Sequence, residues 1–143
     1  MLLGQYEAKI SEKYQAGLPK KFREELGDRL IITKGFENCL IIVAEEKWKT
    51  LLEGTEGKPF TNKSTRELQR FLLGNATYVE LDVKGRFVIP DYLRKFAGIK
   101  DELVFAGIAR FVEIWDRNAW EEHNKELTGE IESIAERLTA GDE

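Results

Sequence analysis

The sequence predicts a mainly β protein with accessory helices, in which two tandem repeats together form a pseudo-twofold β-barrel. Three observations predict this fold. The first half of the chain resembles the second at a spacing of 71 residues, and each half alternates strand patterns with a short helix. Each half has only about 45 residues in such elements, and so small a unit buries only ~60% of its unfolded surface. The two halves are therefore expected to share one core.

The internal repeat is anchored by residue types with strong structural preferences. Lysine, proline, arginine and glycine recur at a spacing of 71, whereas tryptophan recurs at 72, so the second half contains one inserted residue. The matched pairs are Lys13 with Lys84, Pro19 with Pro90, Arg23 with Arg94, Gly27 with Gly98 and Trp48 with Trp120. The repeat indicates that both halves adopt one structure.

Each half predicts the same order of elements. A strand is followed by a turn, a short second strand, and a helix with proline at its first position and glycine just past its end. A hairpin then completes the half. In the first half these elements occupy residues 5–10, the strand that ends at Pro19, 19–26, 29–33 and 40–43. In the second half they occupy residues 76–81, the strand that ends at Pro90, 90–97, 103–106 and 111–115.

Further helices are predicted outside the repeated elements. Both halves enter a helix after the hairpin, at Glu45 and at Asp116, and the aspartate is a good N-cap. Residues 54–63 form a linker, and Ser64-Thr65-Arg66-Glu67 resembles a capping box that opens a connecting helix to Leu73. The predicted organisation is a first repeat (1–53), a linker with the connecting helix (54–75), a second repeat (76–120) and an acidic C-terminal helical tail (121–143).

Composition excludes several classes of protein. Hydrophobic residues make up 42% and charged residues 34% of the chain, which is typical of a globular protein. No apolar run reaches the ~18 residues of a membrane span, and no signal-peptide pattern opens the chain, so a cytoplasmic protein is expected. A single cysteine, Cys39, and a single histidine, His123, exclude an internal disulfide and a His/Cys metal site. No cofactor, small-molecule substrate or catalytic set is indicated, so an enzyme is not expected.

Charge is distributed unevenly along the chain. The formal net charge is −4, but residues 1–72 carry +2, residues 73–120 are neutral and residues 121–143 carry −6. The body therefore combines near-neutrality with local basic clusters, and the tail is a separate acidic element.

A longer motif carries a resemblance to a known family. The string Asp-Val-Lys-Gly-Arg-Phe-Val-Ile-Pro at 82–90, followed by Leu93-Arg94, Gly98 and Glu113-Ile114-Trp115, resembles the second repeat of MraZ proteins. These are bacterial transcriptional regulators with two tandem AbrB-like, swapped-hairpin domains. The resemblance implies a double-split (swapped-hairpin) β-barrel and the assembly of subunits into closed rings. It also implies binding to direct repeats of double-stranded DNA upstream of a division and cell-wall gene operon.

The resemblance also implies which residues face DNA. In AbrB-like domains these are the arginine after the turn glycine and the basic pair of the short helix, here Arg86, Arg94 and Lys95. The matching residues of the first half are Gln15, Arg23 and Glu24. The family's Asp-x-x-x-Arg is replaced by Ser-Glu-Lys-Tyr-Gln at residues 11–15, so the two halves are not expected to contribute equally.

Basic side chains at the turns and in the short helices suit duplex DNA. The duplex carries one phosphate charge per ~1.7 Å of axis, and a guanidinium can also bind guanine O6 and N7. Arg86 either makes such contacts or pairs with Asp82 across its own turn, and the motif alone does not choose. The basic side chains of the first short helix either contact phosphate or form a solvated face. The candidate DNA-binding residues are Lys13, Lys20, Lys21, Arg23, Lys84, Arg86, Arg94 and Lys95.

The predicted function is sequence-specific binding of duplex DNA by a homo-oligomeric, nucleoid-associated regulator that represses by occupying a promoter. In the tail, Leu127, Ile131, Ile134 and Leu138 form one apolar stripe on an otherwise acidic helix. The tail is expected to lie opposite the basic hairpins and to help set the oligomer. The alternative is a protein-interaction scaffold in which the barrel and the acidic tail bind a partner protein.

Overall fold

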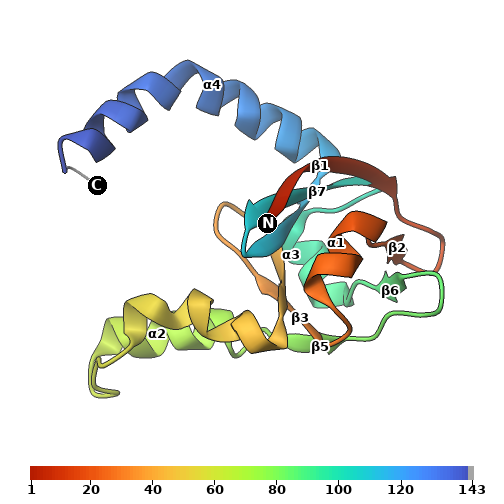
Figure 1. Cartoon of the computed structure of the whole chain (residues 1–143), viewed down its shortest axis with the longest axis horizontal. Coiled ribbons are helices and arrows are strands. Elements are labelled where there is room, and N and C mark those ends of the chain that lie inside the picture. Colours follow the sequence, from red (N-terminus) through yellow and green to blue (C-terminus); the bar gives the residue numbers. More distant parts are fainter. Residues whose placement is uncertain (142–143) are drawn as a thin grey trace.

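The computed structural model describes residues 1–141, and strands from both repeats interleave in one antiparallel sheet (Figure 1). In the described residues this sheet has six strands in the order β1-β7-β8-β4-β3-β5. The strands of this sheet are β1 (Leu2–Lys9), β3 (Leu30–Lys34), β4 (Leu40–Ala44), β5 (Thr77–Val79), β7 (Glu102–Ala109) and β8 (Phe111–Asp116). A separate two-stranded ribbon consists of β2 (Gln15–Gly17) and β6 (Arg86–Val88).

The two repeats exchange strands. β1 of the first repeat pairs with β7 of the second, from Leu2 opposite Ala109 to Lys9 opposite Glu102. β5 of the second repeat pairs in the same way with β3 of the first, and β4 and β8 meet at the centre with Ile41 opposite Glu113. This exchange confirms the prediction of a mainly β fold built from two tandem swapped-hairpin repeats.

The ribbon of β2 and β6 lies on the pseudo-twofold axis. Ala16 is opposite Phe87, and these two positions are 71 residues apart in the sequence. On either side, Gln15 faces Val88 and Gly17 faces Arg86. The ribbon therefore brings the turn before β2 and the turn before β6 to one side of the molecule, at the right of Figure 1.

Helices α1 (Lys20–Leu26) and α3 (Asp91–Ala97) follow the ribbon strands. The sequence placed Pro19 and Pro90 at the first helical positions, but both are N-caps, because their ψ angles of 138° and 143° are extended. Each proline carbonyl accepts the first helical bond, from Arg23 N and Arg94 N at 2.9 Å. The helices end, as predicted, just before a glycine.

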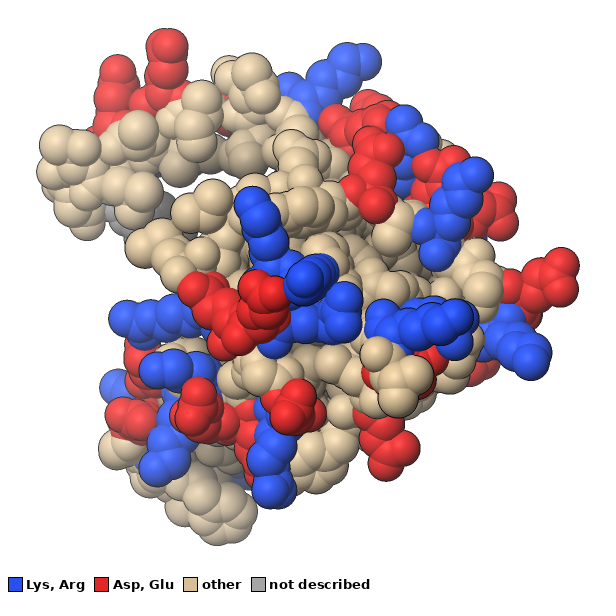
Figure 2. All heavy atoms as spheres, turned by 45° about the vertical axis from the view of Figure 1, so that its right-hand side comes forward, with Lys and Arg blue, Asp and Glu red and all other residues tan. Residues whose placement is uncertain are grey.

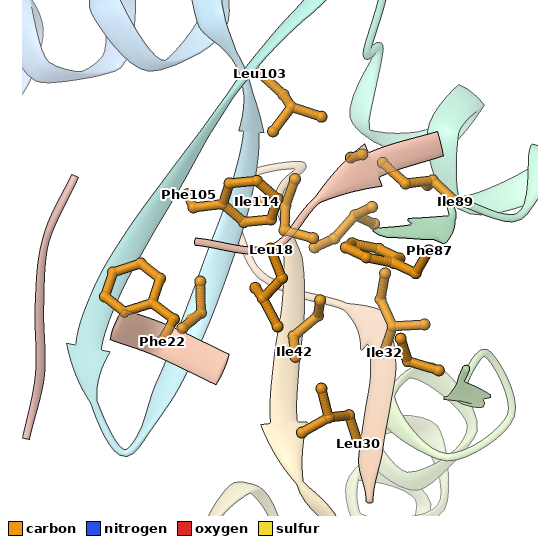
Figure 3. Packing of buried hydrophobic residues seen from close by; sticks show 14 of the residues in the cluster. Leu18, Phe22, Leu30, Ile32, Ile42, Phe87, Ile89, Leu103, Phe105 and Ile114 are labelled. Carbon is orange, nitrogen blue, oxygen red and sulfur yellow. The ribbon is translucent and has the colours of Figure 1, made fainter. Parts of the chain in front are cut away.

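The core is shared by both repeats (Figure 3). Its largest fully buried side chains come from strands and helices of both halves and include Leu30, Ile42, Phe87, Leu93 and Phe105. Figure 3 shows buried side chains of both repeats in one cluster, among them Phe22 of the first repeat and Phe105 of the second. Burying apolar surface contributes roughly 25 cal/mol per Å², so the two repeats stabilise each other. This agrees with the expectation that neither half encloses a core alone.

The outer side of the central sheet carries a second, smaller apolar cluster. There Trp48 and Leu51 pack on Ile31, Ile41 and Val43. The helix predicted to begin at Glu45 is present as η1 (Glu45–Thr55), but it is a 3₁₀-helix rather than an α-helix. Because the core covers one face of β3 and β4 and this cluster covers the other, β4 is apolar throughout and β3 is apolar from Leu30 to Ile32.

The connecting helix α2 (Lys63–Leu72) begins earlier than the predicted capping box. The side chain of Asn62, rather than Ser64, is the cap and accepts a hydrogen bond from Thr65 N at 3.1 Å. Thr65 itself is buried, so the first turn is fixed by packing as well as by the cap. The hydroxyl of buried Thr33 donates to Leu72 O at 2.6 Å and ties the end of α2 to β3.

The C-terminal helix α4 (Arg117–Thr139) leads away from the sheet, on the side opposite the two turns (Figure 1). Asp116 caps it as predicted and accepts from Ala119 N at 3.2 Å. Arg117 pairs with Glu7 of β1 and Glu102 of β7, which joins the first turn of α4 to the sheet, and also with Glu121 of α4 itself. Beyond that turn the helix has no buried residue up to its end at Thr139. Within residues 1–141, no helix combines the length and apolarity needed to cross a lipid bilayer.

Candidate nucleic-acid interface

The turns before β2 and β6 have the same hydrogen-bonded structure. In the second turn, Asp82 Oδ1 accepts from Lys84 N and Arg86 N, both at 2.9 Å. In the first turn, the hydroxyl of Ser11 accepts from the amides of the two equivalent residues, Lys13 and Gln15, at 3.3 and 3.1 Å. Ser11 therefore keeps the capping role of Asp82 but supplies no charge.

Arg86 has the pairing that one reading of the sequence proposed. Its Nε donates to Asp82 Oδ2 at 2.8 Å, while the side chain is 48% exposed. The pKa of Asp82 lies below its usual value, chiefly because the Arg86 amide donates to the carboxylate. Within residues 1–141 the terminal Nη groups of Arg86 make no hydrogen bond, so pairing with Asp82 leaves donors for a base or phosphate.

The lysines around the turns are exposed. Lys13 and Lys84 lie in the turns and Lys21 in α1, and none of the three has an ion-pair partner within residues 1–141. Lys20 lies 3.9 Å from Glu24, and Lys95 lies 3.0 Å from Asp91 with its side chain 75% exposed. Figure 2 shows lysines and arginines gathered across the middle of this side of the molecule, with carboxylates between them. Since α1 has only seven residues, its lysine charges rather than its dipole would attract phosphate.

Arg94 is held within the protein. Its side chain is only 14% exposed and pairs with Asp91. The Cζ of its guanidinium lies 3.7 Å from the centre of the Tyr14 ring, in the turn of the other repeat. This is a close cation–π contact across the repeat boundary.

Arg23, the equivalent residue of the first repeat, contacts the other turn. Its Nε donates to Leu18 O at 2.9 Å. The guanidinium also lies against Gly85, where an added Cβ would come within 2.5 Å of Arg23 Cδ and Cζ. Each turn is thus accompanied by the arginine of the opposite repeat. The structure brings all eight predicted residues around the two turns and short helices, but it gives Arg23 and Arg94 contacts that the exposed lysines lack.

Sequence analysis did not single out Tyr14. It occupies the repeat position of Gly85, and both residues have a positive φ, 60° for Tyr14 and 78° for Gly85. A tyrosine in the left-handed region is strained, and an aromatic residue at a glycine position of the repeat was the available signal.

The remaining reactive groups lie elsewhere. Cys39 is buried, where its Sγ donates to Phe36 O at 3.2 Å and burial raises the pKa of the thiol. His123 is half-buried, because its ring centre lies 4.9 Å from that of Trp115. Trp120 is also half-buried, and its Nε1 donates to Gln5 Oε1 at 2.8 Å. Among residues 1–141, no cluster of His, Cys, Asp and Glu could hold a metal ion.

Two interlocked repeats, each with a lysine in the turn before its ribbon strand, define a tandem-repeat, swapped-hairpin protein. Comparison with known proteins gives the family. The family model described as "MraZ protein" matches the chain twice, at residues 1–71 and 72–141. The chain belongs to the MraZ family, and its relatives are transcriptional regulators.

Several curated relatives match over nearly the full length. "Transcriptional regulator MraZ" of Caldanaerobacter subterraneus subsp. tengcongensis is 42% identical over 138 residues, which are 96% of each chain. The proteins of the same name from Clostridium tetani and Moorella thermoacetica are 40% and 38% identical, over 97% and 96% of each chain. The relatives carry the name of a regulator, which agrees with the expectation that the chain is not an enzyme.

Proposed function

We propose that the chain regulates transcription by binding double-stranded DNA sequence-specifically through the turns before β2 and β6. The observation that carries the proposal is the pairing of these turns on one side of the molecule, with exposed Lys13 and Lys84. Lys20, Lys21 and Lys95 extend the positive charge along the short helices beside them. Displacement of counterions from phosphate by these lysines supplies affinity that does not depend on sequence.

Base reading is assigned to the second turn. Arg86 keeps terminal guanidinium donors for guanine O6 and N7, while Asp82 orients it through Nε. The equivalent first-repeat residue is Gln15, which carries no charge and lies in a turn capped by Ser11. The first turn therefore anchors phosphate, and the second turn reads sequence.

Assembly of several copies would make such a weak site effective. One protomer offers few positive charges, but copies that face direct repeats raise the effective concentration and multiply affinity by ~10² or more. The apolar stripe of α4 is available for a second copy, since Ile131 is 46% and Leu138 67% exposed. We propose a ring-like homo-oligomer that acts as a repressor in the cytoplasm, associated with the nucleoid. The proposed target, a division and cell-wall gene operon, rests on the family resemblance.

A gel-shift titration tests this proposal. A duplex that contains direct repeats from the DNA upstream of the gene that encodes the chain is compared with a scrambled duplex of equal length. Each duplex is titrated at two salt concentrations. We expect selective binding of the repeats and a steep loss of affinity at the higher salt. Equal binding of both duplexes would remove sequence specificity. A failure to bind either would favour the scaffold function, for which the exposed stripe of α4 would then be the docking surface.

A further inference from the structure

We infer that Arg23 and Arg94 are positioning residues, each of which fixes the DNA-facing turn of the opposite repeat. This inference rests on the proposed DNA-binding function, and it separates these two arginines from the lysines that would contact phosphate. We call the two contacts, Arg23 with Gly85 and Arg94 with Tyr14, the reciprocal arginine contacts.

The Arg94 contact uses the whole guanidinium. One face lies 3.7 Å above the Tyr14 ring, and Asp91 accepts a hydrogen bond from its edge. With 14% of the side chain exposed, Arg94 has little surface left for a phosphate. Its neighbour Lys95 also pairs with Asp91 but is 75% exposed. Two adjacent basic residues of one helix thus have different surroundings: Arg94 is covered and Lys95 is open to solvent.

The Arg23 contact reaches the same kind of position by a different route. Gly85 has no side chain, and the guanidinium of Arg23 occupies the space that a Cβ would fill. A hydrogen bond from Arg23 Nε to Leu18 O fixes the direction of the side chain. In the first turn the arginine of the other repeat, Arg94, packs on the ring of Tyr14. In the second turn Arg23 packs on the bare backbone of Gly85.

Backbone hydrogen bonds reproduce the same exchange. Leu18 N donates to Gly85 O and Ile89 N donates to Tyr14 O, both at 3.0 Å. The donors Leu18 and Ile89 are 71 residues apart, as are the acceptors Tyr14 and Gly85. Each turn is thus fixed by one backbone bond and one arginine from the other repeat, and the distance between the turns is set inside one chain.

Fixing that distance has a functional consequence. Contacts to DNA are productive only when both turns present their side chains in register with the duplex. Loss of Arg94 would loosen the turn at residues 11–15, although the residues that touch DNA are unchanged. The expected signature is a lower affinity with an unchanged number of phosphate contacts.

Hydrogen–deuterium exchange and DNA titration of the full chain test this inference together. In Arg94→Ala without DNA, we expect faster exchange at residues 11–15 and unchanged exchange at 82–86. Arg23→Ala should show the opposite pattern. Affinity for the direct-repeat duplex should fall about three- to tenfold in Arg94→Ala, the range of a cation–π contact, with an unchanged slope of log affinity against log salt. The matched control is Lys95→Ala, in which the slope should become shallower by ~0.9 because a phosphate contact is lost.

A second pair of variants keeps the inference testable if the arginine variants fail to fold. Tyr14→Gly removes the ring at a positive φ that suits glycine, and Tyr14→Phe keeps the ring. We expect Tyr14→Phe to match the wild type and Tyr14→Gly to reproduce Arg94→Ala in both measurements. Equal behaviour of the two Tyr14 variants, or a shallower salt slope in Arg94→Ala with unchanged exchange at 11–15, would overturn the inference. If the wild type binds no duplex, the proposed function fails, whereas the exchange measurements still decide whether the reciprocal contacts exist.

Discussion

The guanidinium of Arg94 lies 3.7 Å from the ring centre of Tyr14, although the two residues belong to different repeats. Tyr14 adopts a φ of 60°, a conformation that L-residues other than glycine rarely take. Its counterpart in the second repeat is Gly85, for which the same conformation is free of strain. The first repeat thus accepts local strain at a position where the ring of Tyr14 contacts the arginine of the other repeat.

Replacing Gly85 tests how tightly the second turn is held. In Gly85→Ala the backbone of the alanine is strained at a φ of 78°, and its methyl group displaces the guanidinium of Arg23. We expect the free energy of unfolding in urea to fall by about 1–2 kcal/mol. Gly129→Ala is the matched control, because nothing lies within 4 Å of its position in α4, and stability should rise by up to ~1 kcal/mol. If Gly85→Ala costs the same with and without Arg23→Ala, the two residues are not coupled.

Arg86 and Asp82 are expected to have separable effects. Arg86→Ala removes an exposed ion pair of small value, so the melting temperature should change little, while specific DNA binding weakens by about 1–3 kcal/mol. Asp82→Ala removes the acceptor of two turn amides, so it should lower the melting temperature as well. Thermal melting and gel shifts measure the two effects. Equal loss of stability in both variants would mean that Arg86 mainly holds the turn.

The low pKa of Asp82 gives the second turn a dependence on acid. A carboxylate whose pKa is lower in the folded than in the unfolded protein contributes stability above its unfolded value, and this contribution is lost as pH falls through the folded value. Melting temperatures of the wild type and Asp82→Asn should therefore differ most at neutral pH and converge below about pH 4, near the usual aspartate pKa. A difference that stays constant down to pH 2 would contradict this assignment.

The sequence predicted the fold well because the repeat carries it. The pairs Pro19 with Pro90 and Gly27 with Gly98 located both short helices, and the shared core followed from halves too small to enclose one. The exchange of hairpins, in contrast, was implied by the resemblance to MraZ proteins. Helix starts were less predictable. Asn62 and Ser64 are both good caps, and the packing of Thr65 rather than local preference decides between them.

The surroundings of the basic residues could not be predicted from the sequence. Arg94 and Lys95 are adjacent and chemically alike, yet one is covered and the other is exposed. The difference depends on Tyr14, a contact between residues 80 positions apart that only the strand exchange creates. The pairing of Arg86 with Asp82, in contrast, is local and was one of the two readings that the motif itself offered.

The lysines of α1 should act on all duplexes alike. Lys20 and Lys21 are exposed. The turn of their own repeat is followed by Gln15, where the turn of the second repeat is followed by Arg86. Changing both lysines to alanine should weaken binding to specific and scrambled duplexes by the same factor, and the salt slope should become shallower by up to ~1.8. Gel shifts at several salt concentrations measure both quantities. A loss confined to one operator sequence would instead assign base reading to the first repeat.

The tail of the chain should control assembly rather than operator choice. In α4 the side chains of Ile131 and Leu138 are exposed on a helix that leads away from the turns, so a second copy is the expected cover for the stripe (Figure 1). Its acidic residues would repel phosphate, which agrees with a position away from the DNA-facing side. Truncation after Thr128 removes Ile131, Ile134 and Leu138 and should lower the number of subunits per assembly, which multi-angle light scattering gives as the assembly mass divided by the mass of the truncated chain. Glu130→Gln, on the same helix, should leave the number of subunits unchanged. If the truncated chain keeps its number of subunits and binds DNA more tightly, the tail acts as an electrostatic brake on DNA binding, because the loss of negative charge would then be the only effect.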